Sequence, residues 1–161
     1  MRSVTHSDIP GIDRLLDAAF SPSGYETALV RRLRENKRDI HEWVIEDSTG
    51  IVAYICYSRA YRDAEVIGLH LAPLAVRPDR QGMGLGTAMV SQSLATPPIA
   101  NQTVFVLGSP DYYRRFGFSR VASPVCSFDT DNQHFLALRG KSGRDYVVGY
   151  EAEFTDDGES R

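Results

Sequence analysis

The chain has 161 residues, of which 42% are hydrophobic and 24% are charged, and its formal net charge is −3. This length and composition are typical of one globular domain, which we expect over residues 1–154, followed by a polar acidic tail that frays over residues 155–161. A mildly acidic chain without a run of roughly 20 apolar residues is not expected to bind nucleic acid or to span a membrane.

The first half of the chain predicts two helices followed by three strands. Apolar spacing predicts a helix over residues 8–20, with Pro10 in its first turn, and a second helix over residues 25–36. Strand patterns follow at residues 41–46, 51–59 and 66–76, and the first two form a hairpin. Because Pro73 cannot donate a backbone hydrogen bond, it indicates a bulge or a sheet edge in the third strand.

The second half continues the mixture of helices and strands. A helix is expected from Gly84 or Leu85 to the pair Pro97-Pro98, then a buried strand over residues 103–107 and a short helix over residues 112–116. Two further strands are expected at residues 135–138 and 146–152. This order predicts a mixed α/β fold with a strand–loop–helix–strand unit at its centre.

The loop between the third strand and its helix carries three alternating glycines, Gly82, Gly84 and Gly86. Glycine lets a ligand approach the backbone, and the first N–H groups of a helix form an anion site suited to a pyrophosphate. Thr87 adds a hydroxyl and Arg80 a nearby positive charge. A Walker loop would need a lysine, and a dinucleotide loop would need GxGxxG spacing, so neither fits. The alternative is a glycine-rich turn that binds nothing.

Two motifs resemble those of a known family. The first is Gln-x-x-Gly-x-Gly, formed by Gln81, Gly84 and Gly86 after Leu-Ala-Val-x-Pro, and the second is Tyr-Tyr-Arg-Arg-Phe-Gly-Phe at residues 112–118. Both resemble signatures of the GCN5-related N-acetyltransferase (GNAT) superfamily, and the resemblance is strong from Leu71 to Phe118. It is weak in the N-terminal helices and in the C-terminal third.

This resemblance implies a mixed sheet in which two parallel strands, here residues 66–76 and 103–107, splay apart into a cleft for acetyl-CoA. The pantetheine amides would pair with the backbone around Leu74, Ala75 and Val76. The pyrophosphate would be held by the amides of one continuous segment, namely Gln81, Gly82, Met83, Gly84, Leu85, Gly86 and Thr87. Ser109 lies where the family often has an asparagine, and it would replace one of that residue's hydrogen bonds.

The chemistry implied is direct attack by an amine in a ternary complex. The resemblance favours Tyr113 over Tyr112 as the general acid that protonates the departing sulfur. The alternative is that Tyr113 only packs within an aromatic cluster. His70 is the candidate general base, weighed equally against a satisfied strand histidine, and a water chain could also serve. Cys56 and Cys126 have no base partner or metal-ligand spacing, so we expect free thiols, no covalent intermediate and no metal.

The sequence therefore predicts a cytoplasmic, acetyl-CoA-dependent N-acetyltransferase, monomeric or homodimeric, acting on a primary amine of a small molecule or protein. Two alternatives remain open: a CoA-binding sensor or structural module without acceptor chemistry, and a transferase for a different acyl chain. The acceptor cannot be identified from the sequence. We expect it to be selected by residues 20–25, by the second helix and by the loop over residues 121–134.

Overall fold

The computed structural model describes residues 1–121, 123–141, 143 and 145–155. Its centre is a sheet with the strand order β1-β2-β3-β4-β5-β8-β6. β4 and β5 run parallel, and the other neighbouring pairs in this sheet run antiparallel. The strands are β1 (Arg2–Ser3), β2 (His41–Asp47), β3 (Gly50–Arg62), β4 (Glu65–Val76), β5 (Val104–Leu107), β6 (Ser119–Arg120) and β8 (Phe135–Leu138).

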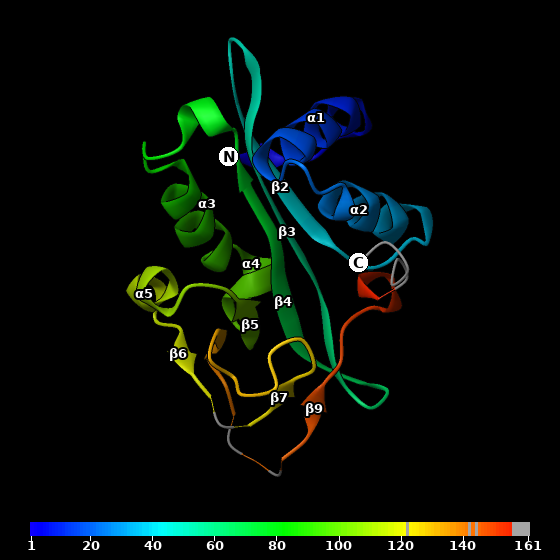
Figure 1. Ribbon diagram of the computed structural model, residues 1–161, viewed down its shortest axis with the longest axis vertical. Helices are drawn as coiled ribbons and strands as arrows, with labels where there is room; N and C mark the ends of the chain where they lie inside the picture. The colour runs from blue at the N-terminus through cyan, green and yellow to red at the C-terminus, as the bar shows by residue number, and fades with distance from the viewer. Residues whose placement is uncertain (122, 142, 144, 156–161) are drawn as a thin grey trace.

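Helices cover both faces of this sheet (Figure 1). The two N-terminal helices lie on one face, and the helices that follow β4 and β5 lie on the other. They are α1 (Ile9–Ala19), α2 (Tyr25–Glu35), α3 (Leu85–Leu94), α4 (Pro97–Ala100) and α5 (Pro110–Tyr113), with short 3₁₀ turns at His6–Asp8, Pro78–Arg80, Arg114–Phe116 and Ala152–Phe154.

Each face of the sheet has its own buried core. Ile12, Leu16 and Val30 pack against one face of the sheet, and Met89 and Val90 belong to the cluster on the other face. These side chains recur at the three- and four-residue spacing of a helix, which is why apolar periodicity locates α1, α2 and α3 correctly. The mixed fold expected from the sequence is confirmed.

The sheet also explains the proline in the third strand. β4 lies between β3 and β5, but β5 pairs with it only at Leu69 and His70, so at Pro73 one side of β4 has no strand partner. On the β3 side the register shifts by one residue, because Tyr57 pairs with Leu71 whereas Ile55 pairs with Leu74. Pro73 therefore lies in a bulge, where no ladder hydrogen bond is required of it.

Two sequence expectations are corrected. The helix before Pro97-Pro98 ends at Leu94, and Pro97 begins the separate helix α4, because proline is tolerated in a first turn. The strand expected over residues 146–152 is only β9 (Val147–Val148), which pairs with β7 (Val125–Cys126) in a small second sheet. Beyond it, Gly149 exchanges backbone hydrogen bonds with Tyr61 in β3. This long-range contact ends the strand.

Two other expectations concern the outer parts of the chain. The fraying tail falls almost entirely on residues 156–161, which lie outside the described residues. Within the described part of the chain, no helix is both long enough and apolar enough to cross a membrane.

Candidate active site

The parallel strands β4 and β5 touch at one end and separate at the other. They pair at Leu69 with Val104 and at His70 with Phe105. Gly68 lies at the closed end, where a Cβ would be only 2.4 Å from the carbonyl oxygen of Thr103, so a larger residue would force the strands apart. Beyond His70 the two strands diverge, which leaves one edge of β4 without a strand partner.

The open edge of β4 presents backbone groups at Leu74 and Val76. The N–H of Arg77 donates to the carbonyl of Val52 in β3 at 2.9 Å. Because successive residues of a strand point their N–H and C=O groups to opposite sides, those of Val76 and Leu74 point to the edge that β5 has left. An extended ligand with amide groups can pair with such an edge as an added strand.

The glycine loop leads from this edge into α3. Gly84 has a φ of 83° and precedes the helix, and the first helical hydrogen bond runs from the Ala88 N–H to the Gly84 carbonyl at 3.0 Å. The N–H groups of Leu85, Gly86 and Thr87 therefore have no acceptor within the helix. A Cβ built at Gly82 or Gly84 would meet no described atom within 4 Å, so the loop surface is open to a ligand.

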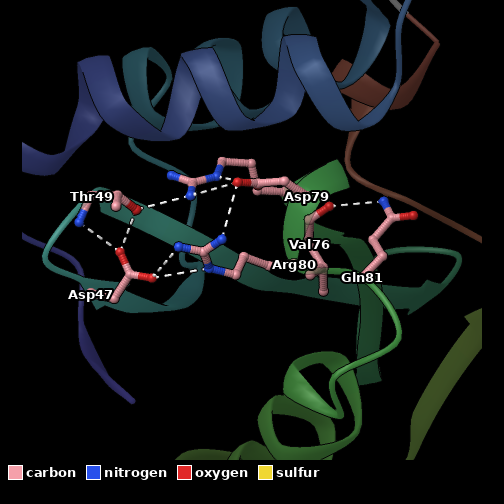
Figure 2. A network of polar contacts seen from close by, with 7 residues as sticks. Asp47, Thr49, Val76, Asp79, Arg80 and Gln81 are labelled. Carbon is pink, nitrogen blue, oxygen red and sulfur yellow. Dashed lines mark hydrogen bonds and ion pairs between the residues drawn. The ribbon is translucent and has the colours of Figure 1, made fainter.

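The start of the loop is held by a polar network (Figure 2). Arg80 forms ion pairs with Asp47 and Asp79, each at 3.1 Å. The Gln81 side-chain amide donates to the Val76 carbonyl at 3.0 Å and closes the turn. Because two carboxylates already offset the charge of Arg80, the backbone amides and the positive end of the α3 dipole are the remaining source of anion attraction.

A cavity of about 620 Å³ opens at the splay, next to the bulge of β4. Four parts of the chain line it: the α1–α2 connection with the first turns of α2, the strands β4 and β5, α5, and the C-terminal third. Leu74 and Tyr113 lie among its lining residues, as do Phe20, Glu26 and Phe128. All three segments expected to select an acceptor contribute to this wall, and residue 122 of the third lies outside the described residues.

Tyr113 reaches the cavity from α5. Its side chain is 9% exposed, and burial raises the pKa of its phenol above the usual value. The ring packs against Gly108, where a Cβ would lie 2.5 Å from Tyr113 Cε2. Tyr112 points elsewhere, since its hydroxyl lies 3.3 Å from Thr87 Oγ1 at the start of α3. Of the two tyrosines, Tyr113 is the one that lines the cavity.

His70 lines the deeper end of the cavity but is fully packed. It is 1% exposed, its Nε2 lies 3.0 Å from the carbonyl oxygen of Gly149, and its ring stacks on Tyr150 with centroids 3.6 Å apart. Burial lowers the pKa of His70 to about 4, so the imidazole is neutral at pH 7. Its role as a base stays a prediction. Its contacts match the alternative, a histidine in a strand whose ring is hydrogen-bonded and packed within the protein.

Comparisons with known proteins agree on one family. The family model for the acetyltransferase (GNAT) domain matches residues 38–120. The N-acetyltransferase YhbS of Escherichia coli K12, itself uncharacterized, is 35% identical over 120 residues, which cover 71% of this chain and 70% of YhbS. This chain belongs to the GNAT acetyltransferase family.

Solved GNAT structures match the whole arrangement. E. coli YhbS in complex with CoA matches with a TM-score of 0.86 at 30% identity, covering 96% of this chain and 90% of that one. A GNAT acetyltransferase from Brucella melitensis in complex with acetyl-CoA matches with a TM-score of 0.79 at 28% identity, covering 95% and 96%. This GNAT protein therefore shares its fold with two proteins whose structures contain CoA or acetyl-CoA.

The structure does not bring all of the expected site residues together. Ser109 lies outside the main cavity, in a second hollow of about 430 Å³. Met83 is 67% exposed at the tip of the glycine loop. Within the described residues, no group of three or more potential metal ligands occurs. Cys56 and Cys126 are buried free thiols, and burial raises the pKa of Cys56 to about 12, which makes it a poor nucleophile.

Several lining residues of this GNAT site escaped the sequence analysis. Glu26 and Phe128 lie in segments expected to select an acceptor, but no motif singles them out. Tyr150 and Phe154 fall in the C-terminal third, where the family motifs are weak, and they reach the cavity only because the chain returns to α2. Gly108 follows β5 directly. A glycine at a strand end can indicate that another group packs closely against the backbone, and this signal is present in the sequence.

Proposed function

We propose that this chain is an acetyl-CoA-dependent N-acetyltransferase that transfers an acetyl group to a primary amine by direct attack in a ternary complex. One observation carries the proposal. The open edge of β4 runs between the unpaired amides at the start of α3 and a cavity that contains a buried tyrosine. A carrier with a pyrophosphate at one end and a thioester at the other would fit this path.

The residues of the chain would divide the work as follows. The amides from Gly82 to Thr87 would hold the pyrophosphate at the helix N-terminus. The edge groups of Leu74 and the N–H of Val76 would pair with the pantetheine amides, with Ala75 directed toward β3 between them; the Val76 carbonyl already accepts from Gln81. Gln81 would act by closing the turn rather than by touching the ligand, because its side chain is bonded to Val76.

Tyr113 is proposed as the general acid. Its raised pKa keeps the phenol protonated at pH 7, so it holds the proton that a departing thiolate requires. When bound, acetyl-CoA supplies the activated acetyl group, and Tyr113 protonates the sulfur as the new amide bond forms. Both cysteines are buried, which supports direct attack rather than an acyl-enzyme.

The base is proposed to be His70, with a water chain as the alternative. His70 borders the cavity and is neutral at pH 7, so it has a lone pair to offer. Its lowered pKa makes it a weak acceptor, and the bond to Gly149 occupies one ring nitrogen. A His70→Ala variant whose kcat/KM keeps the wild-type pH profile would remove histidine from the mechanism.

Calorimetry tests the proposal first. Acetyl-CoA and CoA are expected to bind, and NAD is not, because the loop lacks the features of a dinucleotide site. Tyr113→Phe is then expected to lower kcat by about 100-fold or more while the Kd for acetyl-CoA stays unchanged. Tyr112→Phe is the matched control and should lower kcat far less. A protein with no affinity for acetyl-CoA would refute the proposal, and wild-type turnover in Tyr113→Phe would refute the acid.

A further inference from the structure

The wall of the cavity at the splay is rich in aromatic side chains. Rings from distant parts of the chain meet there: Phe20, Tyr25, Phe105, Phe128, Tyr150 and Phe154. Its volume of about 620 Å³ is within the usual range for small-molecule sites. Phe128 and Leu107 at its border are 40% and 43% exposed, so apolar surface is available for a ligand to cover.

Most polar groups in this wall already bond to the protein. The Tyr25 hydroxyl donates to the Phe154 carbonyl at 2.7 Å. Nε2 of His70 bonds to the Gly149 carbonyl, and the Tyr150 hydroxyl lies 3.5 Å from Cys126 Sγ. In such a cavity, many hydroxyl groups of a hydroxyl-rich ligand would find no hydrogen-bond partner. Each such group would reduce the binding free energy, because it loses its hydrogen bonds to water.

Glu26 differs from these groups because it is an acidic side chain. Among the described residues that line the cavity, it is the one carboxylate, and none of the others is an arginine or a lysine. Ser23 Oγ donates to Glu26 Oε2 at 3.2 Å, and the Ser23 hydroxyl in turn accepts the Tyr25 N–H at 3.1 Å. Glu26 is in none of the ion pairs of the described residues, and no arginine or lysine lines this cavity beside it.

We propose that the acceptor is a primary amine on an apolar, ring-sized body without a carboxylate, and that Glu26 binds its ammonium group on entry. This inference rests on the proposed function, since it identifies the acceptor class of the same site. The aromatic wall covers the body of the ligand, and Glu26 supplies the opposite charge. An α-amino acid would bring a second carboxylate toward Glu26, and a polyamine would carry ammonium groups that find no further carboxylate here.

The test uses the full chain and four probe amines. Phenethylamine represents the proposed class, and phenylalanine, spermidine and a lysine-containing peptide represent its competitors. Binding of acetyl-CoA is measured first by calorimetry on the same preparation, and binding of each amine is then followed by saturation-transfer NMR with CoA present. Acetylation is measured as kcat/KM. Phenethylamine is expected to bind, and its kcat/KM is expected to be about tenfold or more above that of every competitor.

Two variants test the role of the carboxylate. Glu26→Gln keeps the shape and removes the charge, so it is expected to raise KM for phenethylamine by about tenfold and to leave the Kd for acetyl-CoA unchanged. Glu35→Gln is the matched control, because Glu35 is exposed on the same helix and does not line the cavity. It should leave both values unchanged.

The outcomes separate this inference from the proposed function. If acetyl-CoA does not bind, the proposed function is wrong and the inference falls with it. If acetyl-CoA binds but a competitor is acetylated better than phenethylamine, or no probe amine is acetylated, the inference alone is overturned. A Glu26→Gln variant with an unchanged KM for phenethylamine would also overturn it.

Discussion

Gly108 offers a way to move Tyr113 without changing any atom of Tyr113. The glycine follows β5, and the tyrosine ring lies directly against its Cα. A Cβ at position 108 would lie 2.5 Å from Tyr113 Cε2 and 3.1 Å from Cδ2. Carbon atoms in contact prefer 3.5–4.0 Å, so Gly108→Ala requires the ring to shift by about 1 Å.

The expected effect is large on turnover and moderate on stability. A misplacement of about 1 Å in a catalytic group can cost roughly 100-fold, so kcat of Gly108→Ala should fall by about that factor. Overpacking of a buried site typically costs about 1–3 kcal/mol, so the protein should still fold. The Kd for acetyl-CoA should change little, because the glycine loop and the edge of β4 are untouched.

Thiol release by 5,5′-dithiobis-(2-nitrobenzoic acid) measures kcat, and calorimetry measures the Kd. Gly140→Ala is the control, since a Cβ there would meet Ala137 at an ordinary 3.5 Å. If the Tyr113 hydroxyl is the group displaced, adding Gly108→Ala to Tyr113→Phe should cost little more than Tyr113→Phe alone. Wild-type kcat in Gly108→Ala, or fully additive losses in the double variant, would refute the reasoning.

Two further predictions concern stability. Burial lowers the pKa of His70 from 6.5 to about 4, so on acidification the unfolded chain binds this proton before the folded protein does. The free energy of unfolding should therefore fall as the pH drops from 6.5 toward 4. The expected loss is about 2 kcal/mol at pH 5 relative to pH 7. His70→Gln should remove that part of the pH dependence in urea unfolding; an unchanged profile would contradict it. Arg38→Met should destabilise the protein by about 2 kcal/mol, because Glu153 is 0% exposed and pairs with Arg38 at 2.6 Å. Arg62→Met breaks an exposed pair and should cost much less in the same assay.

The sequence predicted the parts of the site that depend on local chemistry. Alternating glycines between a strand and a helix can be recognised without a fold, because each glycine meets a local backbone requirement and the helix amides follow from the start of α3. Pro73 likewise indicated a bulge or a sheet edge in β4, and the register shift shows the bulge. The family motifs at residues 71–118 extended this to the splayed pair of strands, and the family is confirmed. The roles of Tyr113 and His70 remain predictions.

Which side chains meet in the cavity at the splay was decided by the tertiary structure. Glu26 comes from α2, Phe128 from a loop, and Tyr150 and Phe154 from the end of the described chain, and no sequence spacing brings them to one cavity. The C-terminal segment follows long-range contacts, since Gly149 bonds to Tyr61 and Glu153 to Arg38. Local patterns report on neighbours along the chain. The C-terminal segment is instead positioned by contacts between residues 79 and 115 positions apart, which periodicity cannot encode.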